Sequence, residues 1–95
     1  MMIKLTRYWF EFDIDVIEEG LPPGIAMGCG LTAFSYEDAL FILQNNIFIG
    51  KQIPPLKRYI EDIEISTLEP GHVLPNIIMP SFHRGVWYPQ GYSFL

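Results

Sequence analysis

The sequence has little of several features that mark large functional classes. Its one cysteine, Cys29, cannot form an intrachain disulfide, and small exported domains usually depend on such bonds. Its two histidines, His72 and His83, belong to no His-x-x-x-His or Cys-x-x-Cys spacing of the kind that holds zinc. Lys and Arg number 6 against 11 Asp and Glu, so a net charge of -5 argues against binding to nucleic-acid phosphates. We therefore expect no metal, no cofactor and no nucleic-acid partner.

Long hydrophobic runs are also missing. The longest stretch without a charged residue, 20–36, contains Pro22, Pro23 and several glycines that would break a membrane-spanning helix. The residues before Arg7 include no apolar run as long as that of a signal peptide. We expect a protein that resides in the cytoplasm and has no membrane partner.

What is present indicates one small folded domain over residues 1–95. An apolar fraction of 49% is too high for a disordered chain, while 8 Pro and 8 Gly divide the chain into short elements. Apolar and polar residues alternate over residues 7–16, where only Trp9 breaks the polar side, and this pattern predicts a half-buried strand. Further strands are predicted over residues 25–34, 58–66 and 84–89.

One helix is predicted over about residues 36–47. Ser35 can cap its first turn, where acidic residues favour the helix dipole. Phe41 falls on the polar side of this helix, and Phe48 projects in nearly the same direction. Either the loop over residues 50–56 folds over these two rings, or the rings contact a partner.

These elements together predict an α+β fold. We expect a single two-layer domain with a mostly antiparallel sheet of three to five strands and the helix packed on one face. Whether the strand over 25–34, the helix and the strand over 58–66 form a parallel crossover stays open, because the loop before the last of these allows either direction. Gly28 and Gly30 indicate a bulge or a close approach of another backbone.

Few residues could carry catalysis. Cys29 lies between two glycines in an apolar stretch, without a basic neighbour in sequence to lower the pKa of its thiol. Residues 28–33 have the Gly-x-Gly-x-x-Ala form of a dinucleotide site, but the helix cap comes after them and the expected acidic residue does not follow. We expect that the protein is not an enzyme. The alternative is a small enzyme or ligand-binding domain with a pocket near His83, Arg84 and Trp87.

Acidic residues are concentrated in two segments that contain no Lys or Arg. Nine of the 11 acids lie there: Glu11, Asp13, Asp15, Glu18 and Glu19 in the first, and Glu61, Asp62, Glu64 and Glu69 in the second. If both predicted strands turn these side chains to one sheet face, the carboxylates repel one another and a basic partner would relieve the repulsion. The same distribution also fits an ordinary solvated surface.

Four segments of the chain resemble small bacterial immunity proteins, which are encoded beside polymorphic or contact-dependent growth-inhibition toxins. The segments are Tyr8-Trp9-Phe10-Glu11-Phe12-Asp13, Ala33-Phe34-Ser35-Tyr36-Glu37-Asp38-Ala39-Leu40, Asp62-Ile63-Glu64-Ile65-Ser66-Thr67-Leu68 and Arg84-Gly85-Val86-Trp87-Tyr88-Pro89. The resemblance implies a cytoplasmic inhibitor that binds a cognate toxin domain and has no catalytic residues of its own.

The leading hypothesis is therefore a toxin-neutralising protein whose acidic strands cover a basic active-site surface, helped by aromatic anchors. A homodimer that uses the same aromatic residues is a further hypothesis. The residues expected to contact the partner are Trp9, Glu11, Asp13, Asp15, Phe41, Asp62, Glu64 and Trp87.

Overall fold

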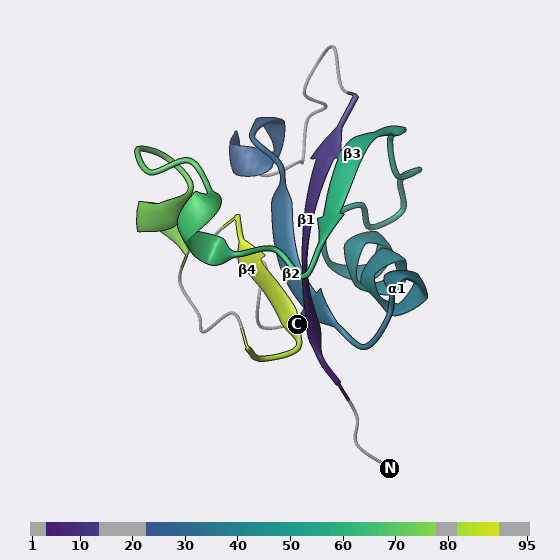
Figure 1. The fold of residues 1–95 in the computed structure, drawn as a ribbon. Coiled ribbons are helices and arrows are strands. Elements are labelled where there is room, and N and C mark those ends of the chain that lie inside the picture. The colour runs from purple at the N-terminus through teal and green to yellow at the C-terminus, as the bar shows by residue number, and fades with distance from the viewer. Residues whose placement is uncertain (1–3, 14–22, 78–81, 90–95) are drawn as a thin grey trace.

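A computed structural model describes residues 4–13, 23–77 and 82–89. Four strands, β1 (Thr6–Phe12), β2 (Cys29–Ala33), β3 (Leu56–Glu61) and β4 (Gly85–Tyr88), form one sheet, and helix α1 (Tyr36–Asn46) packs on one of its faces (Figure 1). Three short 3-10 turns complete the described structure: η1 (Pro23–Ala26), η2 (Ile65–Thr67) and η3 (Leu74–Asn76). The predicted α+β fold with an antiparallel sheet is confirmed.

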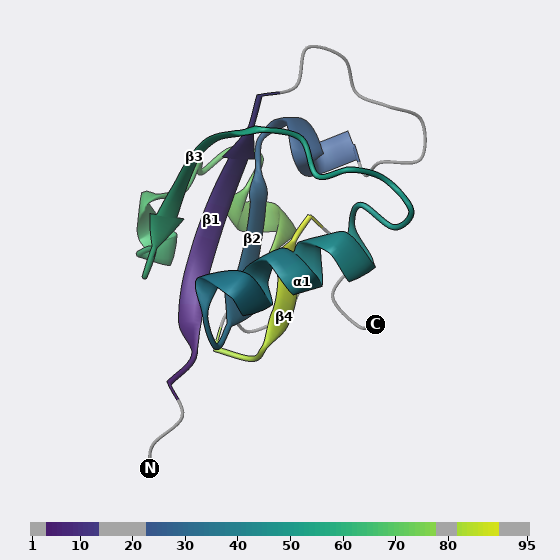
Figure 2. The ribbon, with the colours of Figure 1, turned by 90° about the vertical axis from the view of Figure 1, so that its right-hand side faces the viewer.

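The first strand of the chain is the centre of the sheet. The strand order is β3-β1-β2-β4, and every neighbouring pair is antiparallel. Because β2 and β3 both run against β1, they run parallel to each other with β1 inserted between them (Figure 2). The connection from β2 through α1 to β3 is thus a parallel crossover that passes over β1.

Helix α1 begins where the cap was predicted. The Asp38 amide donates to Ser35 Oγ at 3.0 Å, and the acidic Glu37 and Asp38 occupy the first turn. Ala39, Ile42 and Leu43 of the helix are buried against the sheet.

The two phenylalanines on the outer side of the predicted helix differ in burial. Phe48 is buried, with its ring centroid 5.2 Å from that of Phe12, because the loop after the helix turns back: Gln44 Nε2 donates to the carbonyls of Phe48 and Lys51. Phe41 keeps 60% of its surface exposed. A contact role is therefore wrong for Phe48, while Phe41 is accessible.

Strand bounds differ from the predicted ones where the alternating pattern continues past the sheet. Residues 25 and 26 belong to η1 rather than to β2. Strand β3 ends at Glu61, because Asp62 adopts a left-handed conformation with φ 60°, which Asp tolerates better than most residues. The Ile63 amide then donates to the Arg7 carbonyl, and the chain crosses to the face opposite α1. The predicted residues 14–16 of the first strand lie outside the described part.

The face opposite α1 carries a second hydrophobic cluster. Trp9 and Trp87, at 3% and 0% exposure, pack there with residues of the segment 62–77 that lies across this side of the sheet (Figure 1). Their ring centroids are 6.4 Å apart, and Trp87 Nε1 donates to Thr32 Oγ1 at 3.1 Å. The polar side predicted for β1 is therefore covered around Trp9 and is not an open solvated face.

Two glycines of the β2 region leave the space that the indole rings occupy. Gly30 stands opposite Trp9 on one side and Tyr88 on the other, and a Cβ placed on it would lie 2.2 Å from Trp87 Cζ3. A Cβ on Gly28 would lie 2.5 Å from Trp9 Cζ2 and 2.7 Å from the Phe10 carbonyl oxygen. The predicted close approach is confirmed at Gly28. At Gly30 the approaching group is a side chain, and the alternative of a bulge is confirmed, because the register between β2 and β4 shifts between Gly30 and Leu31.

We predict that Gly30→Ala lowers the free energy of unfolding by about 1–3 kcal/mol, because the added methyl group overpacks the cluster beneath Trp87. Gly71→Ala is the matched control, since a Cβ there would meet only the flexible Glu69 side chain at 3.3 Å. Urea unfolding measures both values. An equal stability for Gly30→Ala and the parent protein would contradict the packing described here.

Candidate functional site

One ion pair joins the residues after β2, the first turn of α1 and the residue before β4, and an exposed phenylalanine ring lies beside it. Arg84, just before β4, donates from Nε to Asp38 Oδ2 at 2.9 Å and from Nη2 to the other carboxylate oxygen. Asp38 Oδ2 also accepts the Phe34 amide at 3.0 Å. The Arg84 guanidinium carbon lies 5.4 Å from the centre of the Phe34 ring, within cation–π range.

Three phenylalanines of this region face solvent. Phe34, Phe41 and Phe82 are 50%, 60% and 68% exposed. Phe41 lies three residues beyond Asp38 on α1, which places it on a neighbouring part of the helix surface. Phe82 comes two residues before Arg84 and packs edge-on against His83 at 4.6 Å between centroids. We call Phe34, Asp38, Phe41, Phe82 and Arg84 the Arg84 patch.

The electrostatics of the Arg84 patch hold its ion pair in the charged form. The hydrogen bonds from Arg84 lower the pKa of Asp38, while partial burial of the carboxyl group opposes this shift. The same contact raises the pKa of Arg84. The guanidinium is therefore positioned beside the exposed Phe34 ring by a carboxylate that remains ionised.

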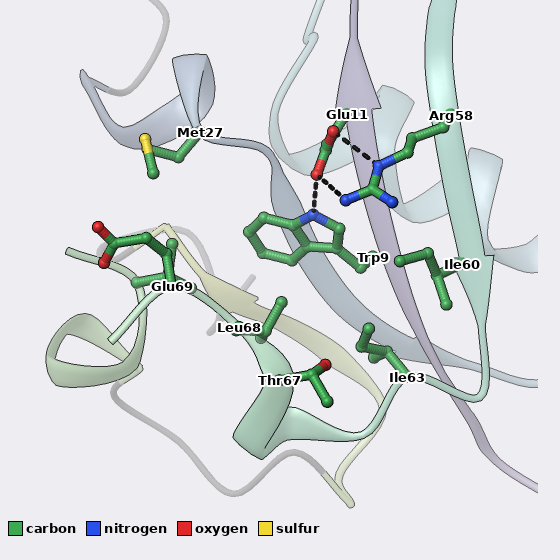
Figure 3. Close-up of a pocket in the computed structure, with 10 residues that line it drawn as sticks. Trp9, Glu11, Met27, Arg58, Ile60, Ile63, Thr67, Leu68 and Glu69 are labelled. Atoms are coloured by element: carbon green, nitrogen blue, oxygen red, sulfur yellow. Dashed lines mark hydrogen bonds and ion pairs between the residues drawn. The ribbon is translucent and has the colours of Figure 1, made fainter. Parts of the chain in front are cut away.

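A pocket of about 450 Å³ lies on the face of the sheet opposite α1 (Figure 3). Its apolar walls include Ile60, Ile63, Leu68 and Val73, and the Trp9 indole lies in its middle. Met27, Thr67, Glu11, Arg58 and Glu69 complete the lining.

The carboxylate of Glu11 in this pocket already has partners. Arg58 donates to it from Nε and from Nη2, each at 2.9 Å, and Trp9 Nε1 donates at the same distance (Figure 3). The hydrogen bond from Arg58 is the main cause that lowers the pKa of Glu11. The sequence hypothesis expected Glu11 to offer a free charge to a partner. Its oxygens instead accept hydrogen bonds from these two side chains, so its charge is not free.

The other predicted acidic contacts do not form one face. Asp13, at the end of β1, is exposed and donates its amide to the Pro55 carbonyl. Asp62 and Glu64 are exposed beyond the end of β3. Since β1 and β3 are antiparallel, their carboxyl-terminal ends point to opposite ends of the sheet. The expectation of one shared acidic strand face is therefore wrong for these residues, and Asp15 lies outside the described part.

The predicted aromatic anchors differ in their accessibility to a partner. Trp9 and Trp87 belong to the second cluster and are not accessible to a partner in this conformation, so their assignment as contact residues is corrected. Phe41 remains an accessible candidate. The sequence hypothesis missed Phe34 and Phe82, because nothing in their local pattern distinguishes an exposed ring from a core ring.

The alternative pocket near His83, Arg84 and Trp87 is not the one described above, since none of these three residues lines it. Trp87 is buried, and Arg84 is bound to Asp38. Cys29 is also buried, and desolvation raises the pKa of its thiol far above the ordinary value, which opposes a role as nucleophile.

Within residues 4–13, 23–77 and 82–89, no group of three or more His, Cys, Asp or Glu side chains is placed to hold a metal ion. None of the helices in these ranges is long and apolar enough to span a bilayer.

We predict that Asp38→Asn lowers the free energy of unfolding at neutral pH by about 1 kcal/mol, because its hydrogen bonds with Arg84 lose their ionic character. The pKa of Asp38 is lowered in the folded protein, so its carboxylate stabilises the fold fully above the ordinary value of 3.8. This stabilisation disappears as the pH falls through the folded value. Urea unfolding below about pH 4 should show a weaker pH dependence for the variant.

Asp62→Asn is the control, because Asp62 is exposed and Asn also tolerates its left-handed conformation. Parallel pH profiles of stability for the parent protein and Asp38→Asn would contradict the role given to the ion pair.

Comparison with known proteins adds no relative. No protein-family model matches the chain, and no curated protein or solved structure is significantly similar to it. The surface features described above therefore carry the functional argument.

Proposed function

We propose that this chain is a cytoplasmic immunity protein, which binds a cognate bacterial toxin domain and blocks the active site of that toxin. The observation that carries the proposal is the Arg84 patch, where a positioned guanidinium lies over the exposed Phe34 ring, and Phe41 and Phe82 on the adjoining segments are also exposed. Large aromatic side chains and arginine are the residues that supply most binding energy at protein interfaces. The resemblance to immunity proteins supplies the class of partner.

The patch is suited to association because its carboxylate already has partners. Asp38 pairs with Arg84 and with the Phe34 amide, so a partner can cover the ion pair without leaving its carboxylate unpaired. Burying an exposed phenylalanine ring contributes about 1.5–3 kcal/mol by area.

The acidic residues have a separate role in this proposal. Asp13, Asp62 and Glu64 are exposed and lie at different ends of the sheet, and the net charge of the protein is -5. Charges spread in this way act over distance and accelerate the encounter with a basic toxin surface, rather than forming one buried contact. The aromatic patch supplies the contact energy, and the acids raise the association rate.

A second candidate function rests on the pocket beside Trp9. Its volume of about 450 Å³ falls within the range of small-molecule sites, which is about 300–1,000 Å³, and its walls are largely apolar. Native mass spectrometry of the purified protein tests this candidate. A ligand site requires that a small molecule is bound to the parent protein and is absent from the Ile63→Arg variant, whose new side chain would fill the pocket.

We predict that Phe41→Ala and Phe82→Ala each weaken binding to the product of the neighbouring toxin gene at least tenfold, because each removes an exposed ring from the Arg84 patch. Ile49→Ala is the matched control, since Ile49 is equally exposed but follows the other end of α1. Calorimetry measures the affinity, and growth during toxin expression measures protection. Full protection by a variant that carries both Phe41→Ala and Phe82→Ala would contradict the assignment of the patch.

We predict that Asp13→Lys and Glu64→Lys, combined, slow the association with the toxin about tenfold in low salt and leave dissociation nearly unchanged. The effect should fade at high ionic strength, because these side chains are exposed and their field is screened. Stopped-flow measurements at several salt concentrations give both rates. Unchanged association rates at low salt would remove the electrostatic part of the proposal and leave the aromatic part.

A further inference from the structure

Strand β3 is an edge of the sheet, and no described residue pairs with its outer side. In the described part of the chain it pairs only with β1, and Figure 2 shows it as the outermost strand on that side. Lys57, Arg58, Tyr59 and Glu61 are all exposed. An open edge presents backbone donors and acceptors that can pair with another chain.

The backbone hydrogen bonds show which residues of β3 turn these groups outward. The Arg7 carbonyl of β1 accepts the Ile63 amide, so the odd-numbered residues of β1 direct their backbone groups toward β3. Trp9 and Glu11 are opposite Ile60 and Arg58, which therefore face β1. Because the direction alternates along a strand, Tyr59 and Glu61 point their amides and carbonyls away from the sheet.

Two opposite charges flank Tyr59 on this edge. Arg58 is bound to Glu11, but neither Lys57 nor Glu61 has an ion-pair partner among the described residues. A register shift opposite Glu11 and Phe12 leaves Lys57 without an opposite residue on β1. As far as the described residues show, one copy of the strand thus carries a cation without an ion pair at one end and an anion without an ion pair at the other.

We propose that two copies of this chain join through antiparallel pairing of their β3 strands, centred on Tyr59. Tyr59 then pairs with Tyr59 of the second copy, and each Lys57 comes beside Glu61 of the other copy. The pairing extends the sheet to eight strands in the order β4-β2-β1-β3-β3-β1-β2-β4, with both α1 helices on one face.

The aromatic residues behind the edge support the same register. Tyr59 lies on the α1 side, where its ring centroid is 5.8 Å from that of Phe10 and 4.8 Å from that of Tyr36. Pairing at Tyr59 therefore brings two supported aromatic rings together across the two-fold axis, a favourable cross-strand combination. A register centred on Arg58 would instead place like charges directly opposite each other, which is unfavourable.

Charge-reversal variants of the full chain test this register. Sedimentation equilibrium should show a dimer of the parent protein that dissociates on dilution. Glu61→Lys and Lys57→Glu should each raise the dissociation constant at least tenfold, because each places like charges together in both symmetric contacts. An equimolar mixture of the two variants should form a heterodimer, and the doubly reversed K57E/E61K protein should again form a homodimer.

Glu64→Lys is the charge control, because Glu64 is exposed but lies beyond β3, and it should leave the dimer intact. Circular dichroism checks that each variant is folded. A parent protein that stays monomeric at millimolar concentration would overturn the proposal, as would single variants that still dimerise or a mixture that does not. The monomeric variants should still bind the toxin, since the edge contains no residue of the Arg84 patch.

Discussion

The packing of Trp9 against Trp87 is the interaction on which the rest of the structure depends. The two rings come from β1 and β4, which are separated in the sheet by β2. They can approach only because Gly30 places no side chain between them. This contact and the segment 62–77 cover the second face of the sheet, so β1 is buried on both sides. A small domain gains much of its stability from such a strand, because so little of its surface is otherwise removed from water.

Burial of the tryptophans decides which aromatic residues are left for function. Most large apolar side chains are buried in the two hydrophobic clusters, one on each face of the sheet. The exposed rings of Phe34, Phe41 and Phe82 belong to neither cluster. The Arg84 patch and the β3 edge are thus separate surfaces. One domain can in this way bind a toxin through the patch and a second copy of itself through the edge, under the two proposals made above.

Local signals in the sequence were sufficient for the elements and for the fold class. The Ser35 cap and the final short strand appear where they were predicted, and the alternation predicted over residues 7–16 is seen up to Phe12, where β1 ends. Alternation could not reveal that β3 stops at Glu61, because Ile63 and Ile65 keep the same period after the chain leaves the sheet. Nor could it show that the side of β1 carrying Trp9 is covered, since this depends on contacts with residues far along the chain. The same limit applies to the site: which rings are exposed is set by tertiary packing, and only Phe41 was identified.

The position of β1 also has a consequence for the timing of folding during synthesis. Trp9 is made early, but its partner Trp87 is among the last described residues, whereas the ion pair from Glu11 to Arg58 closes a shorter loop. Until residue 87 has left the ribosome, the Trp9 side of the central strand lacks the partner ring of Trp87. The second hydrophobic cluster is therefore complete only after synthesis has passed β4, so this face of the domain forms late.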